Sequence, residues 1–320
     1  MPTILIAGGT GLIGSRLSEM LRERGHAVRI LSRRPSAAGQ FAWNPAEGTM
    51  DDAALLGADV IINLAGAGIA DRRWTAARKR ELVQSRVQSA RTLREALVRS
   101  GHRPQVYLSA SAIGYYGNSG EQPMRETDEP VDQSFMVECC RQWEQAAAEV
   151  AALGIRTAVL RIGVVLAQEG GALAEFVKPL RFGLGAYFGD GRAWYSWIHR
   201  DDVCRIFLWA MENPAASGLS AEAFTPAKFG QAGAKVEVYN AVAPHPARNA
   251  DLVRATAKAM RQWAVFVPAP AFVMRLVLGE MSAVILNSNL VSADKLLAAG
   301  FEFRHPELEG ALADVFGRAG

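Results

Sequence analysis

The stretch Met1-Pro-Thr-Ile-Leu-Ile-Ala-Gly-Gly-Thr-Gly-Leu-Ile-Gly14 decides the fold of this chain. Residues 4–7 form a short apolar run that predicts a buried strand, and apolar residues recur near helical spacing after the glycines. A strand, a glycine turn and a helix in this order present backbone N–H groups and a positive helix end to a pyrophosphate. The spacing is GxxGxxG and not the GxGxxG of the simplest dinucleotide fingerprint. We therefore predict a dinucleotide site, with a tight turn packed against a sheet as the alternative.

Strand and helix patterns alternate through the first half of the chain. Further apolar runs predict strands at residues 28–31, 60–64, 106–109 and 157–160, and helical patterns cover residues 82–98 and 135–152. Alternation of this kind predicts a Rossmann-like, doubly wound α/β fold, in which helices cover both faces of a parallel sheet.

The alternation ends near Gly163, where a glycine-rich region begins. We expect residues 1–165 to form a nucleotide-binding Rossmann domain, completed by about residues 195–240. Residues 166–194 and 241–320 are expected to form a smaller α+β substrate lobe, with the active cleft between the two lobes. Residues 219–235, rich in Ala, Gly and Pro, are predicted to be a surface insertion.

Bulk composition favours a small-molecule partner. The net charge of +3 is too small to indicate binding to nucleic acid or to an anionic membrane. The longest apolar stretch, residues 272–286, contains Arg275 and Glu280 and is too short to span a bilayer. The few cysteines lack zinc-like spacing and indicate a reducing, cytoplasmic setting. The five histidines are scattered, so we predict no metal site.

The end of the second predicted strand indicates which nicotinamide cofactor binds. An acidic residue at this position normally accepts hydrogen bonds from the ribose hydroxyls of NAD. This chain has Ser32-Arg33-Arg34 instead. A hydroxyl and two guanidiniums suit a 2′-phosphate, because arginine offers a planar bidentate fork and a permanent charge. NADP(H) is therefore the preferred cofactor, and NAD(H) is the alternative if these arginines form only a solvated basic turn.

Further motifs resemble those of the extended short-chain dehydrogenase/reductase superfamily, which includes nucleotide-sugar epimerases and dehydratases. Beside the glycine turn they are Asn63-Leu-Ala-Gly66, Ser109-Ala-Ser-Ala-Ile-Gly-Tyr-Tyr-Gly117, Arg161-Ile-Gly-Val-Val-Leu166 and Trp197-Ile-His-Arg-Asp-Asp-Val203. More narrowly, Arg73-Trp-Thr75, Ser85-Arg-Val87, Gly279-Glu-Met281 and Gly300-Phe301 resemble an atypical epimerase-family branch whose substrate is undefined. The resemblance covers nearly the whole chain apart from residues 219–235.

The resemblance implies roles for the matching residues. Ser111 corresponds to the serine that hydrogen-bonds the reacting carbonyl or alcohol oxygen. The cofactor would be held at the pyrophosphate by Gly8, Thr10, Gly11, Leu12, Ile13 and Gly14, on the adenine and ribose side by Leu64, Ala65 and Gly66, and near the nicotinamide by Val164 and Val165.

The chain departs from the superfamily pattern at the catalytic pair. Typical members use a Tyr-x-x-x-Lys motif, in which the lysine lowers the pKa of the phenol and holds the nicotinamide ribose. When Glu144 sets the register, these two positions are Met136 and Cys140. Methionine has no titratable proton and a thiol carries no positive charge. No Tyr-x-x-x-Lys motif occurs elsewhere in the sequence.

A nonstandard group would then have to move the proton. Tyr115, close after Ser111, is our candidate, provided that a cation lowers the pKa of its phenol. We expect Arg86 to be that cation and to contact the cofactor, and Glu81 to pair with Arg86 or with the ribose. The alternatives are that Tyr115 is a packed aromatic and that Arg86 is an ordinary ion-pairing residue.

Two other groups of residues have both a functional and a structural interpretation. Aromatic and cationic residues between 181 and 197 either bind an anionic or ring-bearing substrate or seal the interface between the lobes. In the stretch around His199, an aspartate is expected to cap a helix that begins near Val203.

Two functions remain in competition. The leading hypothesis is an NADP(H)-dependent oxidoreductase or epimerase-like enzyme that acts on a small polar, nucleotide-sugar-like substrate, with a homodimer compatible with the sequence. The alternative is a catalytically silent NADP(H)-binding regulatory or sensor protein, and the missing Tyr-x-x-x-Lys motif favours it.

Overall fold

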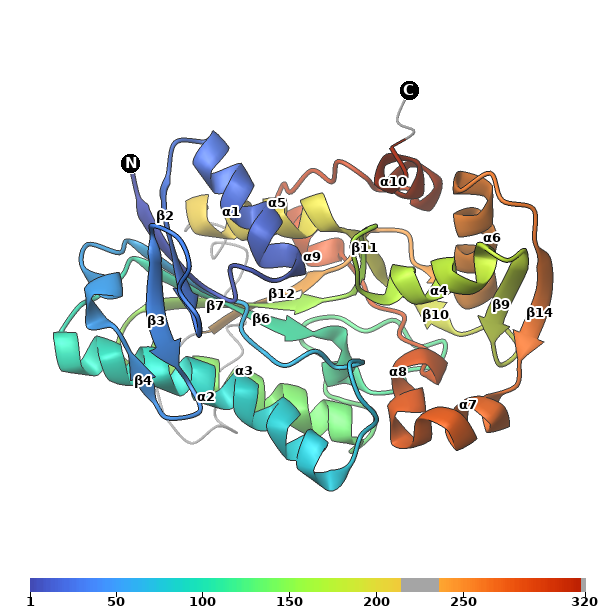
Figure 1. Ribbon diagram of the computed structural model, residues 1–320, viewed down its shortest axis with the longest axis horizontal. Helices are drawn as coiled ribbons and strands as arrows, with labels where there is room; N and C mark the ends of the chain where they lie inside the picture. The colour runs from blue at the N-terminus through green and yellow to red at the C-terminus, as the bar shows by residue number, and fades with distance from the viewer. Residues whose placement is uncertain (214–235, 318–320) are drawn as a thin grey trace.

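One large sheet organises the chain, for which a computed structural model describes residues 1–213 and 236–317. Its strands are β1 (Thr3–Ala7), β2 (Ala27–Ser32), β3 (Gln40–Asn44), β4 (Thr49–Met50), β5 (Val60–Asn63), β6 (Val106–Ala112), β7 (Arg156–Ile162) and β12 (Val236–Ala241). They lie in the order β12-β7-β6-β5-β1-β2-β3-β4, and only β4 runs antiparallel to its neighbour (Figure 1). The predicted doubly wound parallel sheet is confirmed. The insertion predicted at residues 219–235 lies outside the described residues.

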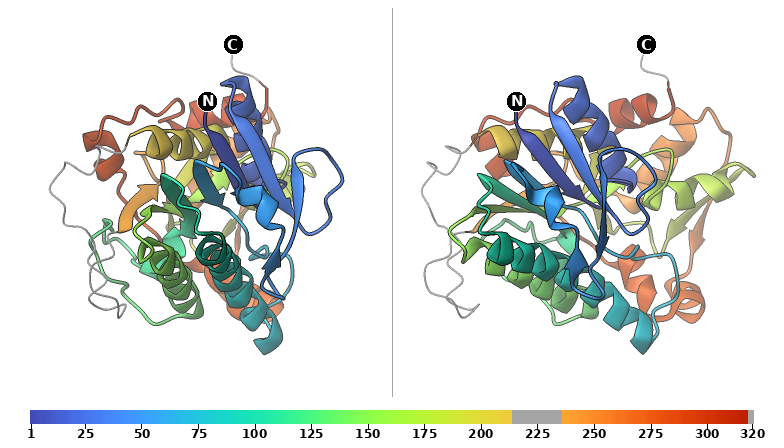
Figure 2. Two further views of the ribbon diagram at one scale, coloured as in Figure 1. Left: turned by 90° about the vertical axis from the view of Figure 1, so that its left-hand side faces the viewer. Right: turned by 60° about the vertical axis from the view of Figure 1, so that its left-hand side comes forward.

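Helices cover both faces of this sheet (Figure 2). On one face, α1 (Leu12–Glu23) and α5 (Arg200–Glu212) pack on alternate residues of β1 such as Ile4 and Ile6. On the other face, α2 (Ala76–Ser100) and α3 (Phe135–Ala151) cover Leu5 and its neighbours. Because both faces are buried, the central strands are apolar at almost every position, as the sequence pattern indicated.

A smaller lobe adjoins the carboxyl ends of these strands. It is built on three strand pairs: β8 (Val164–Leu166) with β11 (Trp197–His199), β9 (Leu184–Phe188) with β14 (Val265–Ala269), and β10 (Trp194–Tyr195) with β13 (Ala247–Arg248). Its helices are α4 (Ala172–Leu180), α6 (Asn249–Ala259), α7 (Ala271–Leu278), α8 (Ala283–Leu286) and α10 (Leu308–Val315), and α4, α6 and α10 share one apolar core. The remaining short helices are η1 (Asp52–Leu55), η2 (Ile113–Tyr116), η5 (Gly279–Ser282) and α9 (Asp294–Ala298). The apolar stretch 272–286 is divided among α7, η5 and α8, and no helix in the described ranges is both long and apolar enough to cross a membrane.

The turn between β1 and α1 is closely packed. Gly8 adopts a φ of +80°, and its carbonyl oxygen accepts a hydrogen bond from the N–H of Gly11 at 3.1 Å. A side-chain Cβ at Gly14 would overlap that same carbonyl oxygen, and a Cβ at Gly8 would lie 2.8 Å from the carbonyl carbon of Leu64. Glycine is therefore required here for a left-handed backbone conformation and for close packing of helix against strand.

His199 joins the two lobes at the start of α5. Its Nδ1 accepts the backbone N–H of Asp201 at 3.1 Å, so the imidazole caps a helix that begins at Arg200. Our expectation of an aspartate cap near Val203 was wrong, because Asp201 instead accepts hydrogen bonds from the guanidinium of Arg16 at 3.0 Å.

His199 also contacts α10, the last helix described. Its Nε2 lies 3.3 Å from Oδ2 of Asp314 on α10, and the ring centroids of His199 and His305 are 4.0 Å apart. Because Nδ1 accepts a hydrogen bond, neutral His199 carries its proton on Nε2 and donates it to Asp314. Burial, together with the neighbouring His305, lowers the pKa of His199.

Acidification should therefore destabilise the fold through His199. Since the pKa of the folded state lies below the unfolded value of about 6.5, the unfolded chain takes up the proton first, and stability falls as the pH falls below that value. His199→Asn keeps a capping side chain but does not titrate. Between about pH 7.5 and about pH 5.5, the melting temperature of this variant should fall less than that of the wild type. Equal decreases in the two proteins would contradict this account.

Gly14→Ala should lower the free energy of unfolding by about 1–3 kcal/mol, because the new methyl group meets backbone atoms that cannot yield. Gly310→Ala is the matched control. Its Cβ would lie in open space on α10, so the variant should gain about 0.5–1 kcal/mol from higher helix propensity. Urea unfolding measures both changes, and a Gly14→Ala protein as stable as the wild type would argue against the close packing of this turn.

Candidate functional site

The sequence-predicted cofactor residues meet at one edge of the large sheet. In the strand order, β1 lies between β2 and β5, so chain connections leave β1 in opposite directions on its two sides. Open α/β sheets bind ligands at such a switch point, beyond the carboxyl ends of the strands. The glycine turn follows β1, Ser32-Arg33-Arg34 closes β2, and Leu64 follows β5 directly against Gly8. We call this place the cofactor crevice.

The glycine turn fits a pyrophosphate. Gly11 is the N-cap of α1 and supplies no side-chain cap, so no side chain of the turn occupies the first N–H groups of the helix. Thr10 and Gly11 are exposed, whereas Gly14 is buried against Gly8. An open helix N-terminus beside a backbone cradle is suited to binding an anion.

The arginines after β2 remain available to a ligand. The hydroxyl of Ser32 accepts the backbone N–H of Arg34 at 3.2 Å, which forms an exposed turn. Within residues 1–213 and 236–317, neither Arg33 nor Arg34 has a hydrogen-bond or ion-pair partner for its guanidinium. This placement is compatible with a 2′-phosphate site and also with a solvated basic turn.

Glu81 does not pair with Arg86, contrary to one of our expectations. Its carboxylate lies 2.8 Å from Nη1 of Arg78 and 3.7 Å from Nη2 of Arg72. The side chain of Arg78 is only 5% exposed and requires a carboxylate partner, which explains why Glu81 turns toward it. The hydrogen bond from Arg78, and then the charges of Arg72 and Arg33, hold the pKa of Glu81 below its usual value.

Arg86 lies beside the crevice, against the helix that would carry the missing lysine. A Cβ at Gly66 would be 3.2 Å from the Cζ of Arg86, and the guanidinium lies 4.9 Å from the centroid of the Trp143 ring. Its positive charge acts to lower the pKa of Cys139, although burial raises that pKa more strongly. Arg86 thus places a cation between the start of the β5–α2 connection and α3.

Ser111 is buried, and its hydroxyl already has an acceptor. Its Oγ donates a hydrogen bond to Oε1 of Glu144 at 2.7 Å. The carboxylate of Glu144 in turn accepts hydrogen bonds from Nε and Nη2 of Arg161, each at 2.9 Å. The predicted contact to a reacting oxygen stays a prediction, and it would require the hydroxyl hydrogen of Ser111 to leave Glu144.

Tyr115 is a buried aromatic whose nearest cation is not the one expected. The guanidinium carbon of Arg161 lies 3.4 Å from the centroid of its ring. Burial raises the pKa of Tyr115, even though Arg161 acts in the opposite direction. The condition for its proposed role as a base, a pKa lowered by Arg86, is therefore not met. In the described part of the chain its hydroxyl has no hydrogen-bond partner, whereas the neighbouring Tyr116 donates to Asn240 and accepts from Arg161.

Met136 and Cys140 occupy the positions that the sequence assigned to the catalytic pair. A Cβ at Gly114 would lie 2.8 Å from Cε of Met136 and 3.8 Å from Sγ of Cys140, so both side chains face η2. Burial raises the pKa of the Cys140 thiol. Methionine has no ionisable proton, and the Cys140 thiol stays protonated and uncharged at neutral pH, so neither replaces the tyrosine–lysine pair.

The aromatic residues of the smaller lobe are used internally. Nε1 of Trp194 donates to Glu121 at 2.8 Å, and the hydroxyl of Tyr195 donates to the carbonyl of Ile285 at 2.5 Å. Nε1 of Trp197 donates to the carbonyl of His245 at 2.9 Å. These contacts support sealing of the lobe rather than substrate binding.

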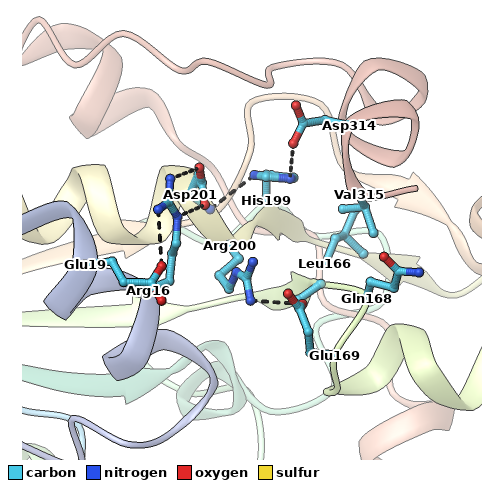
Figure 3. Close-up of a pocket in the computed structure, with 11 residues that line it drawn as sticks. Arg16, Glu19, Leu166, Gln168, Glu169, His199, Arg200, Asp201, Asp314 and Val315 are labelled. Atoms are coloured by element: carbon cyan, nitrogen blue, oxygen red, sulfur yellow. Dashed lines mark hydrogen bonds and ion pairs between the residues drawn. The ribbon is translucent and has the colours of Figure 1, made fainter. Parts of the chain in front are cut away.

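A cavity of about 290 Å³ lies between α1, α5 and α10 (Figure 3). Its charged side chains satisfy one another, as in the ion pairs of Arg16 with Asp201 and of Arg200 with Glu169. None of the predicted site residues lines it.

The pair of His199, which lines this cavity, and His305, which lies beside it, does not suit a metal ion. Ligand atoms of His199, His305 and Asp314 lie within 4.8 Å of one another, so our reasoning that the histidines are scattered was wrong for this pair. Nε2 of His199 carries the proton that it donates to Asp314, however, and only a deprotonated nitrogen can ligate a metal.

Comparison with known proteins agrees with this architecture. Residues 4–224 match the NAD dependent epimerase/dehydratase family, and residues 269–315 match DUF1731, a domain of unknown function. Epimerase family protein SDR39U1 of Mus musculus is 33% identical over 315 residues, which are 98% of this chain and 99% of that protein. An epimerase family protein of Staphylococcus epidermidis is 34% identical over an alignment of 324 positions, which covers 98% of this chain and 99% of that protein.

A solved structure extends the likeness to three dimensions. The crystal structure of human epimerase family protein SDR39U1 (isoform 2) with NADPH superposes with a TM-score of 0.82 at 30% identity, covering 98% of this chain and 99% of that one. The large parallel sheet, the glycine turn and the matched sequence together show that this chain belongs to the NAD dependent epimerase/dehydratase family, within the extended short-chain dehydrogenase/reductase superfamily.

Proposed function

We propose that this protein binds NADP(H) in the cofactor crevice and does not perform the tyrosine–lysine proton transfer of its superfamily. One contrast carries the proposal. The backbone and cations that suit a phosphorylated dinucleotide are open, whereas Met136 and Cys140 occupy the positions of the proton-transfer pair. The protein would act as a regulatory or sensor protein that responds to the level of this cofactor.

Separate groups of residues would hold three parts of the cofactor. The pyrophosphate would lie on the turn, and Arg33 and Arg34 would meet the 2′-phosphate through charge-assisted hydrogen bonds. Arg86 would replace the missing lysine near the nicotinamide ribose. The full set is Gly8, Thr10, Gly11, Leu12, Ile13, Gly14, Ser32, Arg33, Arg34, Leu64, Ala65, Gly66, Glu81, Arg86, Val164 and Val165. The human relative with NADPH supports the choice of cofactor.

A second candidate is an NADP(H)-dependent oxidoreductase or epimerase-like enzyme that acts on a small polar, nucleotide-sugar-like substrate. Bound NADPH would supply a hydride to a carbonyl carbon, and Tyr115 would supply the proton to the carbonyl oxygen. The free hydroxyl of Tyr115 within the described residues favours this candidate, because a phenol with a raised pKa keeps its proton and can act only as an acid. Ser111 has no part in this version, since its hydroxyl is bonded to Glu144.

Arg33→Ala and Arg34→Ala should each weaken NADPH binding about tenfold, because each removes a charge-assisted contact to the 2′-phosphate. Binding of NADH should stay nearly unchanged. Titration of the purified protein, followed by the fluorescence of the reduced nicotinamide, measures both affinities. Arg22→Ala is the control, since this exposed arginine lies in the last turn of α1. Wild-type protein that binds NADH as tightly as NADPH would refute the assignment.

The two candidate functions differ in turnover. With NADPH and a panel of aldehydes, ketones and nucleotide sugars, we expect tight cofactor binding and no oxidation of NADPH, because no accessible group performs the usual proton transfer. Absorbance of the reduced nicotinamide measures the reaction. If the wild type turns over, Tyr115→Phe abolishes the turnover and Ser111→Ala preserves it, the sensor is rejected and the enzyme is supported.

A further inference from the structure

We propose that Arg72 is a third cation for the 2′-phosphate of NADP(H), held beside the cofactor crevice by the Arg78–Glu81 ion pair. This inference rests on the proposed function, because it assumes that the crevice binds this cofactor. Neither the sequence motifs nor the family match pointed to Arg72.

The position of Arg72 follows from the connection between β5 and α2, residues 64–75, which we call the strap. The strap starts against the glycine turn, where Leu64 contacts Gly8, and it ends at Thr75, the N-cap of α2. Arg33 leaves the sheet from β2, on the other side of β1. Arg72 and Arg33 therefore belong to opposite walls of the crevice.

Glu81 interacts with arginines that come from both sides of β1. Oε1 of this carboxylate lies 3.7 Å from Nη2 of Arg72, while Oε2 lies 2.8 Å from Nη1 of Arg78. Arg33 acts on the same carboxylate through its charge. A second carboxylate, that of Asp71, lies 3.5 Å from Nη2 of Arg78. Two carboxylates thus stand among three guanidiniums, and the one positive charge in excess is available to a phosphate.

The three contacts differ in strength, and this difference singles out Arg72. Arg78 is buried and tied to the strap, where its Nη2 donates to the carbonyl of Gly68 at 2.5 Å. The side chain of Arg72 is 72% exposed, and its 3.7 Å separation from Glu81 is longer than a hydrogen bond. Arg72 is therefore positioned by Glu81 but weakly held.

An incoming phosphate would compete well for this guanidinium. A phosphate monoester carries a charge of about −1.5 to −2 at neutral pH and three acceptor oxygens, against a single charge on Glu81. Glu81 would keep its stronger partner, Arg78, when Arg72 turns to the phosphate. The exchange therefore leaves no buried charge without a partner.

The neighbouring Arg73 serves a different surface and supplies a matched control. Its Nη2 donates to the carbonyl of Leu276 on α7 at 3.4 Å, and its guanidinium lies beside Gly279. Two consecutive arginines thus have different neighbours: Arg72 approaches Glu81, and Arg73 approaches the smaller lobe.

The test compares NADPH and NADH binding to the purified full chain by fluorescence titration. Arg72→Ala should weaken NADPH binding about five- to tenfold, should leave NADH binding within about twofold, and should reduce the salt dependence of NADPH binding. Arg72→Lys should recover part of the loss, because it keeps the charge but not the bidentate fork. Arg73→Ala should leave the ratio of the two affinities unchanged.

The outcomes separate this inference from the proposed function. If the wild type prefers NADPH and Arg33→Ala removes that preference, but Arg72→Ala has no effect or weakens both cofactors equally, the role of Arg72 is refuted and the proposed function stands. If the wild type binds NADPH no better than NADH and Arg33→Ala has no effect, the proposed function itself fails.

Discussion

A buried ion pair between Arg161 and Glu144 holds together the part of the molecule that would otherwise be the reaction centre. Both side chains are almost fully buried, and the guanidinium bonds both carboxylate oxygens at 2.9 Å. Because taking two charges out of water costs free energy, such a pair is tolerated only when the remaining polar atoms also find partners. Ser111 and Tyr116 supply two of them, and the ring of Tyr115 covers the guanidinium. The pair thus joins α3 and β7 to η2. It also occupies the hydroxyl of Ser111 and the ring of Tyr115, which the sequence suggested as catalytic groups.

The glycine turn with its exposed arginines and the region around Met136 and Cys140 therefore differ in how open they are to a ligand. The dinucleotide half keeps what anion binding requires, which is an uncapped helix start, a close-packed glycine turn and exposed guanidiniums. The half that would move protons is apolar or closed, since Met136 and Cys140 face η2 and burial keeps the thiol protonated. A fold that hosts many activities can retain its cofactor site while its chemical site is rebuilt.

The charged side chains around the crevice fall into two groups, one firmly held and one weakly held. Arg78 and Glu81 form an anchored pair that belongs to the strap and the first turns of α2. Arg33, Arg34 and Arg72 are exposed and weakly held, so they can reorient at little cost when an anion arrives. In the proposed function, the anchored pair would position the mobile arginines for a phosphate without a large energetic cost in the empty protein.

The sequence alone determined the parallel sheet, the glycine turn and the absence of a Tyr-x-x-x-Lys pair. It also located the helices predicted at 82–98 and 135–152, which are α2 (Ala76–Ser100) and α3 (Phe135–Ala151) in the structure. These features follow from periodicity and from residues a few positions apart, which local backbone preferences control. Only the tertiary structure decided which partners the polar side chains take. Ser111 bonds Glu144, 33 residues away. His199 bonds Asp314 on α10, and Glu81 pairs with Arg78 and Arg72 rather than with Arg86. A buried polar group must be paired with whatever the folded chain brings within reach, and no local pattern encodes that choice.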